Sequence, residues 1–166
     1  MFVRRARIED VEAIALIMAA IAQEGLIGTE PPVDLEVQAR RFREVIEAES
    51  PTAAWVLEDA GRVVGSADAH ERASGVLYIG MGILLEARRR GGGRTFLQAV
   101  LEHARSCGAH KLELEVWIDN ARAISVYASA GFEVEGLRRN HYRRRDGQLR
   151  SALLMARLLH ADEPPR

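Results

Sequence analysis

The sequence predicts an α/β fold, a single domain in which helices flank a mixed, mostly antiparallel central sheet. Two observations support this prediction. Three strand-like apolar runs follow one another between residues 53 and 84 with only short turns between them, which is typical of antiparallel strands. A glycine-rich turn then leads from the third run into a helix and a further strand, and such a strand–helix–strand unit forms a right-handed parallel crossover. A length of 166 residues is that of one domain.

In the first third of the chain, the pattern predicts one strand and two helices. Apolar residues from Val11 to Ile21 recur at helical spacing, and Asp34 is a typical N-cap for a second helix that must stop before Pro51. The predicted elements are a strand at 2–7, a helix that starts at Glu9–Asp10 and ends at Gly25, a proline-bearing loop at 26–33, and a helix capped by Asp34.

The rest of the chain is predicted to complete the sheet. Residues 59–62 carry a hairpin signal, and Gly108 and Gly131 are typical helix ends. The predicted elements are strands at 53–58, 63–70 and 76–84, a helix at 95–107, a strand at 111–118, a helix at 121–130, and strands at 132–137 and 151–159 joined by a basic segment with its turn at Asp146-Gly147. Residues 1–160 form the predicted domain, and the polar tail at 161–166 is expected to be flexible.

Composition narrows the classes of partner. A net charge of −1 gives no reason to expect a nucleic-acid partner, and the apolar run at 13–22 is too short to span a bilayer. The single cysteine, Cys107, excludes an intrachain disulfide and a cysteine-cluster metal site. We therefore expect no metal and no membrane, and a reducing cytoplasm is the simplest setting.

The turn after residue 84 has the composition of an anion site. Glycines let the backbone N–H groups approach a ligand closely, and the start of the following helix adds the positive end of its dipole. The P-loop pattern fails because Gly93 is followed by Arg94-Thr95, and the dinucleotide fingerprint fails because Phe96 takes the place of a small residue. The stretch consists of Arg88, Arg89, Arg90, Gly91, Gly92, Gly93 and Arg94, which leaves the spacing R-x-x-G-x-G.

Two motifs together resemble the GNAT superfamily of acyl-CoA-dependent N-acyltransferases. Residues 81–93 resemble its strand and pyrophosphate loop, and residues 120–132 resemble its second motif, N-x-x-A-x-x-x-Y-x-x-x-G-F. The resemblance covers about 76–159, and the end of the chain is similar to the branch that acetylates small amines, including amino acids and phosphinothricin-like compounds. It implies that 1–160 is an N-acetyltransferase domain with a GNAT-like sheet, acetyl-CoA as the donor and no metal.

The resemblance also implies residue roles. The loop at 88–94 would hold the pyrophosphate of coenzyme A, with about two of its four arginines facing solvent, since exposed pairs contribute little. The strand at 81–83 would splay from the strand at 112–117 and offer main-chain groups to the pantetheine and to the thioester oxygen. Tyr127 would give a proton to the departing thiolate, and Asn120 would cap its helix, bind the cofactor, or both. The implied cofactor residues are Met81, Gly82, Ile83, Arg88, Arg89, Arg90, Gly91, Gly92, Gly93, Arg94 and Asn120.

Several points stay open. The acceptor is expected to be a small primary amine; the rivals are a protein N-terminus or lysine, a non-catalytic acyl-CoA-binding domain, and RNA association. A homodimer is also left open. The basic cluster between Arg138 and Arg145 would receive a carboxylate-bearing substrate or an acidic partner, or be a solvated hairpin. Candidates for the general base are Tyr78, Glu30, Glu71, Glu115, His70 and His141.

Overall fold

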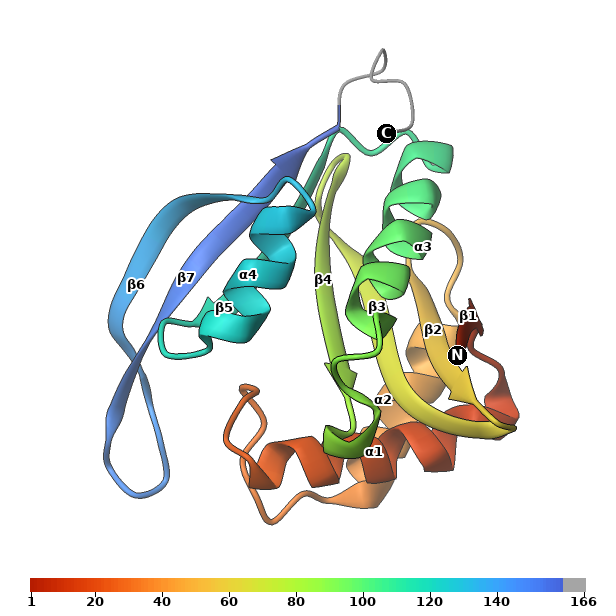
Figure 1. Ribbon diagram of the computed structural model, residues 1–166, viewed down its shortest axis with the longest axis horizontal. Helices are drawn as coiled ribbons and strands as arrows, with labels where there is room; N and C mark the ends of the chain where they lie inside the picture. Colours follow the sequence, from red (N-terminus) through yellow and green to blue (C-terminus); the bar gives the residue numbers. More distant parts are fainter. Residues whose placement is uncertain (160–166) are drawn as a thin grey trace.

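The computed structural model describes residues 1–159. Its helices are α1 (Val11–Gln23), α2 (Leu35–Glu47), α3 (Gly92–Ser106) and α4 (Ala121–Ser129), with short 3-10 helices at Ile8–Asp10 and Leu85–Ala87. Its strands are β1 (Phe2–Arg5), β2 (Ala53–Asp59), β3 (Arg62–Ala73), β4 (Val76–Ile83), β5 (Lys111–Trp117), β6 (Glu133–Arg143) and β7 (Leu149–Leu158). Within the described residues these strands form one seven-stranded sheet in the order β1-β2-β3-β4-β5-β7-β6 (Figure 1).

The sheet is antiparallel except at its centre. β4 and β5 pair in parallel, and α3 makes the crossover between them, whereas the other neighbouring strands pair antiparallel. The predicted mixed, mostly antiparallel sheet is therefore confirmed. The parallel pair is also where the sheet opens, because no pairing joins the two strands beyond Tyr78 and Glu113.

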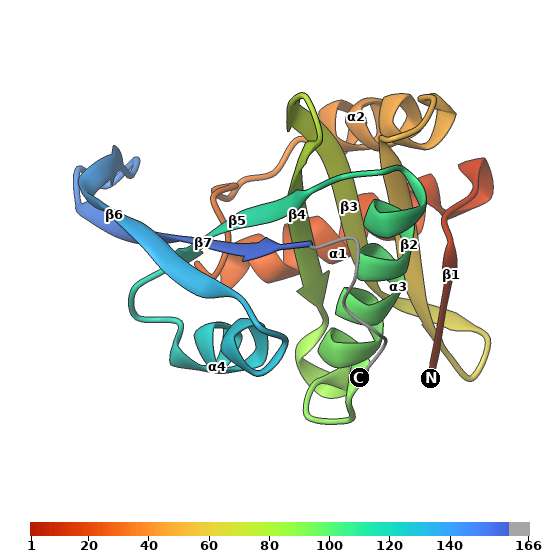
Figure 2. The same ribbon diagram turned by 90° about the horizontal axis from the view of Figure 1, so that it is seen from above.

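Helices cover both faces of the sheet. α1 and α2 lie on one face, and α3 and α4 lie on the other (Figure 2). The alternation of side chains in β2 explains both layers: Val56 packs with Ile14 and Phe42 of the first pair, and Leu57 joins the larger core that includes Phe96. Across residues 1–159, no helix combines the length and the apolar character needed to cross a membrane.

Several element boundaries differ from the prediction. The first strand ends at Arg5 rather than at residue 7, because a 3-10 turn starts at Ile8. α3 begins at Gly92, earlier than the predicted residue 95, since Gly91 provides its N-cap with φ 86°. β6 and β7 extend well into the basic segment, where exposed charged side chains are compatible with an edge strand. The predicted flexible tail at 161–166 lies outside the described residues.

Candidate active site

A cavity of about 1020 Å³ lies where β4 and β5 separate. Its walls come from β3, β4 and β5, from α1 and the loop after it, from the turn that leads into α3, and from α4. Among the residues that line it are Met81, Gly82, Ile83, Arg88, Arg89, Gly91, Gly92, Gly93, Arg94, Asn120 and Tyr127. The structure thus brings together the residues expected from sequence, except for Arg90, which is not among the described lining residues.

The opening between β4 and β5 leaves part of the β4 backbone unpaired on one side. Leu84 N–H donates to Val64 O at 2.9 Å, so ladder alternation turns the backbone groups of Ile79, Met81 and Ile83 away from β3. One of these groups, Ile83 O, accepts a hydrogen bond from Arg88 Nε at 2.8 Å. The predicted splay is confirmed, and the backbone groups of Met81 face the gap.

The start of α3 is a favourable place for an anion. No side chain caps the helix, and its first turn carries no acidic residue. Thr95 N–H makes the bond to Gly91 O, so the N–H groups of Gly92, Gly93 and Arg94 precede the regular helical bonds. Unpaired N–H groups and the positive dipole end therefore meet at one edge of the cavity.

The four arginines of the turn have different surroundings. Arg88 donates to both carboxylate oxygens of Glu24 at 2.6 Å, which ties the turn to the end of α1. Arg90 donates to Asp59 at 2.6 and 3.2 Å and points away from the cavity lining. Arg89 and Arg94 are exposed, line the cavity, and have no ion pair within residues 1–159. These two guanidinium groups remain available to an anionic ligand.

Tyr127 reaches the cavity from α4. Asn120 is the N-cap of this helix and accepts from Ala123 N–H at 3.2 Å, so its capping role is present in the structure. The ring of Tyr127 is buried at 7% exposure and packs on Phe132 with centroids 5.8 Å apart. Burial, with a smaller contribution from nearby Tyr78, raises the pKa of Tyr127 above its ordinary value. Its hydroxyl is therefore protonated at neutral pH and can act as a proton donor.

A carboxylate and two tyrosines form another wall of the cavity. The Tyr142 hydroxyl donates to Glu115, and Arg138 Nε lies 3.2 Å from the same carboxylate. Burial and this hydrogen bond raise the pKa of Tyr142 to about 12. Burial, followed by the negative charge of Glu115, also raises the pKa of Tyr78. Both hydroxyls therefore stay neutral at this wall.

Two of the six candidates for the general base line the cavity, namely Tyr78 and Glu115. The other four are not among its described lining residues, and each has a local partner. Glu30 accepts from Arg145 N–H, Glu71 accepts from Gly75 N–H, His70 lies 3.6 Å from Asp68, and His141 lies 3.3 Å from Arg138.

Sequence reasoning missed several polar residues of the cavity. Asp68 and Ser66 are buried on β3 at 7% and 2% exposure, and Arg41 of α2 lies 3.7 Å from Asp68. The only signal for Asp68 was a charged residue within a strand of small side chains, where a buried carboxylate is uncommon. Tyr142 was missed because the predicted strand ended at residue 137, whereas β6 continues to Arg143.

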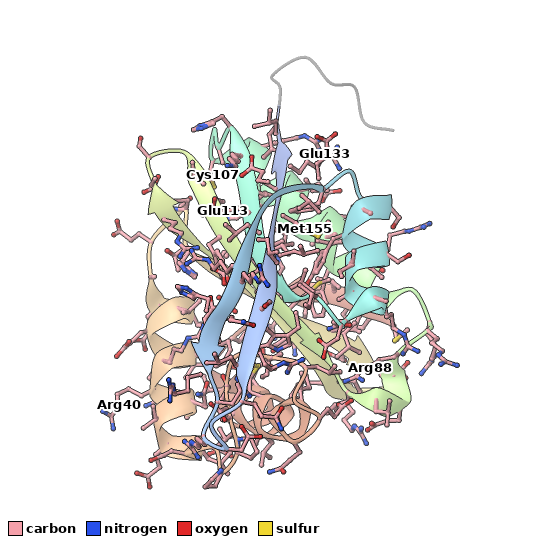
Figure 3. All side chains as sticks on the ribbon, turned by 90° about the vertical axis from the view of Figure 1, so that its left-hand side faces the viewer. Arg40, Arg88, Cys107, Glu113, Glu133 and Met155 are labelled. Atoms are coloured by element: carbon pink, nitrogen blue, oxygen red, sulfur yellow. The ribbon has the colours of Figure 1, made fainter. Side chains whose placement is uncertain are left out.

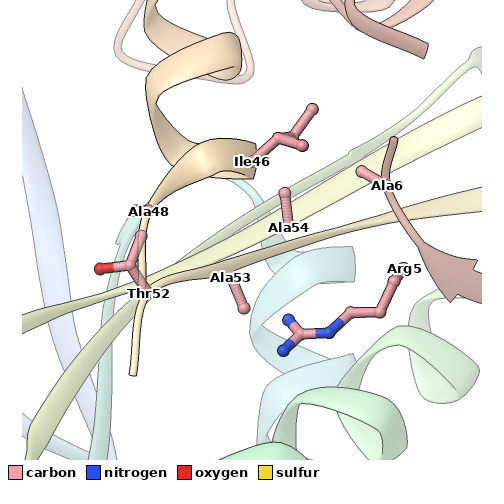
Figure 4. Close-up of a pocket in the computed structure, with 7 residues that line it drawn as sticks. All are labelled: Arg5, Ala6, Ile46, Ala48, Thr52, Ala53 and Ala54. Carbon is pink, nitrogen blue, oxygen red and sulfur yellow. The ribbon is translucent and has the colours of Figure 1, made fainter. Parts of the chain in front are cut away.

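A second, smaller cavity of about 230 Å³ lies between β1, β2 and the end of α2 (Figure 4). Arg5 and Thr52 are the polar side chains among its described lining residues, with five alanines or isoleucines around them. Arg5 stacks over Trp55 at 4.8 Å and lies 3.4 Å from His103. No acid, base and nucleophile are arranged together among the described residues that line this cavity, so we assign the chemistry to the larger one.

Fold and cavity together define a class of α/β enzyme with an anion-binding helix start beside a gap in a mixed sheet. The chain belongs to the acetyltransferase (GNAT) family, whose family model matches residues 18–132. The resemblance seen in the two sequence motifs is therefore confirmed.

Similar proteins include enzymes with protein and small-molecule acceptors. The chain is 39% identical over 69 residues to the [ribosomal protein bS18]-alanine N-acetyltransferase of Escherichia coli K12, a match that covers 42% of this chain and 46% of that protein. The match thus spans about half the length of such curated relatives.

Two solved structures share the fold over nearly the whole chain. The ribosomal-protein-alanine N-acetyltransferase of Brucella melitensis has a TM-score of 0.85 at 26% identity, with 96% of this chain and 100% of that chain covered. The phosphinothricin acetyltransferase of Sinorhizobium meliloti, solved in complex with AcCoA, has a TM-score of 0.84 at 21% identity, with coverages of 99% and 92%.

Proposed function

We propose that this protein transfers an acetyl group from acetyl-CoA to a primary amine of a small molecule, directly and in a ternary complex. The observation that carries the proposal is the continuous cavity that runs from the uncapped start of α3, through the gap between β4 and β5, to the buried hydroxyl of Tyr127. The end of the cavity at α3 suits the phosphates of the donor, and the end at Tyr127 suits the transfer of the acetyl group.

The residues present fit coenzyme A. The N–H groups of Gly92, Gly93 and Arg94 would bind the pyrophosphate, with Arg89 and Arg94 adding positive charge. The β4 backbone at Met81, where no strand pairs on the β5 side, would bind the pantetheine amides. Arg88 supports the turn through Glu24 and Ile83 rather than through the ligand. Bound acetyl-CoA supplies the acetyl group as a thioester.

Two groups of the chain would assist the transfer. A backbone N–H near Met81 would donate to the thioester oxygen as negative charge develops there, a contact worth about 2.7–4 kcal/mol in acyl transfer. The Tyr127 hydroxyl would stabilise the departing thiolate by donating a hydrogen bond to it, or by giving up its proton; the raised pKa keeps the hydroxyl neutral and able to donate.

Glu115 is our choice for the group that takes the proton from the amine. It is the candidate carboxylate that lines the cavity, and Tyr142 and Arg138 fix its orientation. A water molecule between Glu115 and the amine would complete the path. We also propose the cytoplasm as the place of this activity, because a reducing compartment is the simplest setting for a chain with a single cysteine.

A protein N-terminus is the second candidate for the acceptor. The observation in its favour is the similarity to ribosomal-protein-alanine N-acetyltransferases in both comparisons. A protein acceptor differs from a small amine because the polypeptide that follows its N-terminal amine must extend out of the cavity.

The test is acetyl-CoA turnover by the wild-type protein against amino acids, polyamines, aminoglycosides and short peptides with free N-termini. We expect acetylated product from at least one small amine and no acetylated enzyme by mass spectrometry. Tight binding of acetyl-CoA without turnover of any amine would instead indicate a binding domain.

A further inference from the structure

The loop between α1 and α2 forms one wall of the acceptor end of the cavity. Four consecutive residues of this loop line it, Leu26, Ile27, Gly28 and Thr29. Trp117 and Tyr142 line it from β5 and β6. The position of the loop therefore decides how much room an acceptor has.

The hairpin of β6 and β7 holds this loop from the far end of the sequence. Arg144 Nη1 donates to Gly28 O at 2.8 Å, and Arg145 Nη1 donates to Pro31 O at 2.8 Å. Glu30 accepts from Arg145 N–H at 2.9 Å and lies 3.5 Å from Arg144 Nε. Figure 3 views the molecule from the side on which this hairpin lies in front of the loop.

A third arginine makes the same connection nearer to α4. Arg150 Nη1 donates to Gly25 O at 2.6 Å, and its Nη2 donates to Asp119 at 2.6 and 2.7 Å. Its guanidinium also stacks over Trp117, 4.5 Å from the ring centroid. Arg150 thus joins the start of the loop to the turn that precedes the Tyr127 helix.

These contacts are the main restraint on the loop. Within residues 1–159, the hydrogen bonds that join residues 25–33 to elements other than α1 and α2 come from these three arginines. The side chains of Arg144 and Glu30 are 11% and 21% exposed, so salt screens their attraction less than it would at an open surface. The hairpin also contains Arg139 and Arg143, whose side chains are exposed and make no hydrogen bond or ion pair within the described chain.

We propose that Arg144, Arg145, Arg150 and Glu30 form a latch that holds the α1–α2 loop across the acceptor end and limits the size of the acceptor. This inference rests on the proposed function, because it concerns the amine acceptor of the same cavity. The latch holds the loop on the side of the cavity that Trp117 and Tyr142 also line, so we expect it to leave less room for the residues that follow the amine of a peptide. The latch is therefore a determinant of specificity, and its residues do not take part in the chemistry.

The test compares two double variants that each remove two positive charges from the hairpin. Arg144→Ala/Arg145→Ala opens the latch, and Arg139→Ala/Arg143→Ala is the matched control. For each protein, kcat/KM is measured with the best small amine and with a hexapeptide that has a free N-terminus. We expect the ratio of peptide to small amine to rise about tenfold or more in the latch variant, and to stay at the wild-type value in the control.

Hydrogen exchange provides a readout that does not depend on activity. We expect faster amide exchange in the peptide that covers 25–34 in the latch variant, and unchanged exchange in α3 and α4. If the double variant fails to fold, Glu30→Ala removes the loop side of the same contacts and is used in its place.

The outcomes separate the latch from the proposed function. An unchanged ratio, or unchanged exchange of the loop, would contradict the latch while small-amine turnover by the wild-type protein still stands. A wild-type protein that already prefers the hexapeptide to every small amine would contradict both the size limit and the small-amine acceptor.

Discussion

Alanine substitutions at the first two glycines of α3 should change two different properties, the stability of the fold at Gly92 and ligand binding at Gly93. A Cβ on Gly92 would lie 2.5 Å from Cδ2 of Leu57 and 3.2 Å from Cδ1 of Ile83. Leu57 is fully buried, so its side chain can shift only against packed neighbours, and overpacking of this kind costs about 1–3 kcal/mol. Alanine recovers about 0.5–1 kcal/mol relative to glycine in a helix. We expect Gly92→Ala to lower the free energy of unfolding by about 1 kcal/mol, the difference between the midpoints of these two ranges.

At the neighbouring glycine, Gly93, we expect substitution by alanine to leave the stability intact and to weaken ligand binding. A Cβ on Gly93 would lie 3.5 Å from Cγ1 of Val126 and 3.9 Å from Cε of Met81, which are ordinary contacts. We therefore expect Gly93→Ala to be as stable as the wild type, or more stable by up to about 1 kcal/mol. Gly93 lines the cavity at the proposed pyrophosphate site, so its new methyl group should weaken coenzyme A binding about tenfold, or about 1.4 kcal/mol.

Urea unfolding and calorimetric titration with coenzyme A measure the two quantities. A Gly93→Ala variant that binds coenzyme A as tightly as the wild type would refute the placement of the pyrophosphate. A Gly92→Ala variant as stable as the wild type would refute the packing argument.

Three further predictions concern the chemistry and the stability of the fold. Tyr127→Phe should reduce kcat by roughly 10²–10⁴-fold while the Kd for coenzyme A stays unchanged; equal kcat values would remove Tyr127 from the reaction. Glu115→Gln, which still accepts from Tyr142, should reduce kcat by roughly 10²–10⁴-fold while the Kd for coenzyme A stays unchanged, and an unchanged kcat would point to another base. Hydrogen bonds from Arg4 at 2.7 and 2.8 Å lower the pKa of Asp10, so the stability they contribute is complete above the unfolded pKa and is lost as pH falls through the folded pKa. Chemical unfolding of Asp10→Asn should therefore show a loss of about 1.5–3 kcal/mol at neutral pH that disappears in acid; a loss that is independent of pH would contradict this reasoning.

The sequence was most informative where local pattern and chain order agree. Hairpin signals between 53 and 84 and the crossover at the glycine turn were enough to predict the mixed sheet. The start of α3 was missed because glycine has low helix propensity, whereas packing of Gly92 on Leu57 overrides that preference. The extent of β6 was missed because its charged residues are typical of a turn.

Contacts between distant residues could not be predicted from the sequence. The partners of Arg88, Arg90 and Arg144 lie 64, 31 and 116 positions away, and nothing in the local pattern distinguishes these arginines from Arg89 or Arg143. The sequence therefore predicted where positive charge gathers, and the structure determines which charges hold the fold and which remain available to a ligand.

The most direct test of the central claim is the protection of backbone amides by the donor. Hydrogen exchange is measured on the wild-type protein with and without desulfo-coenzyme A, which lacks the reactive thiol. With the ligand bound, we predict slower amide exchange at 79–83 in β4 and at 91–95 at the start of α3, with little change in β1 and β2. Protection confined to other segments, or none at saturating ligand, would contradict the claim that the gap between β4 and β5 is the coenzyme A site.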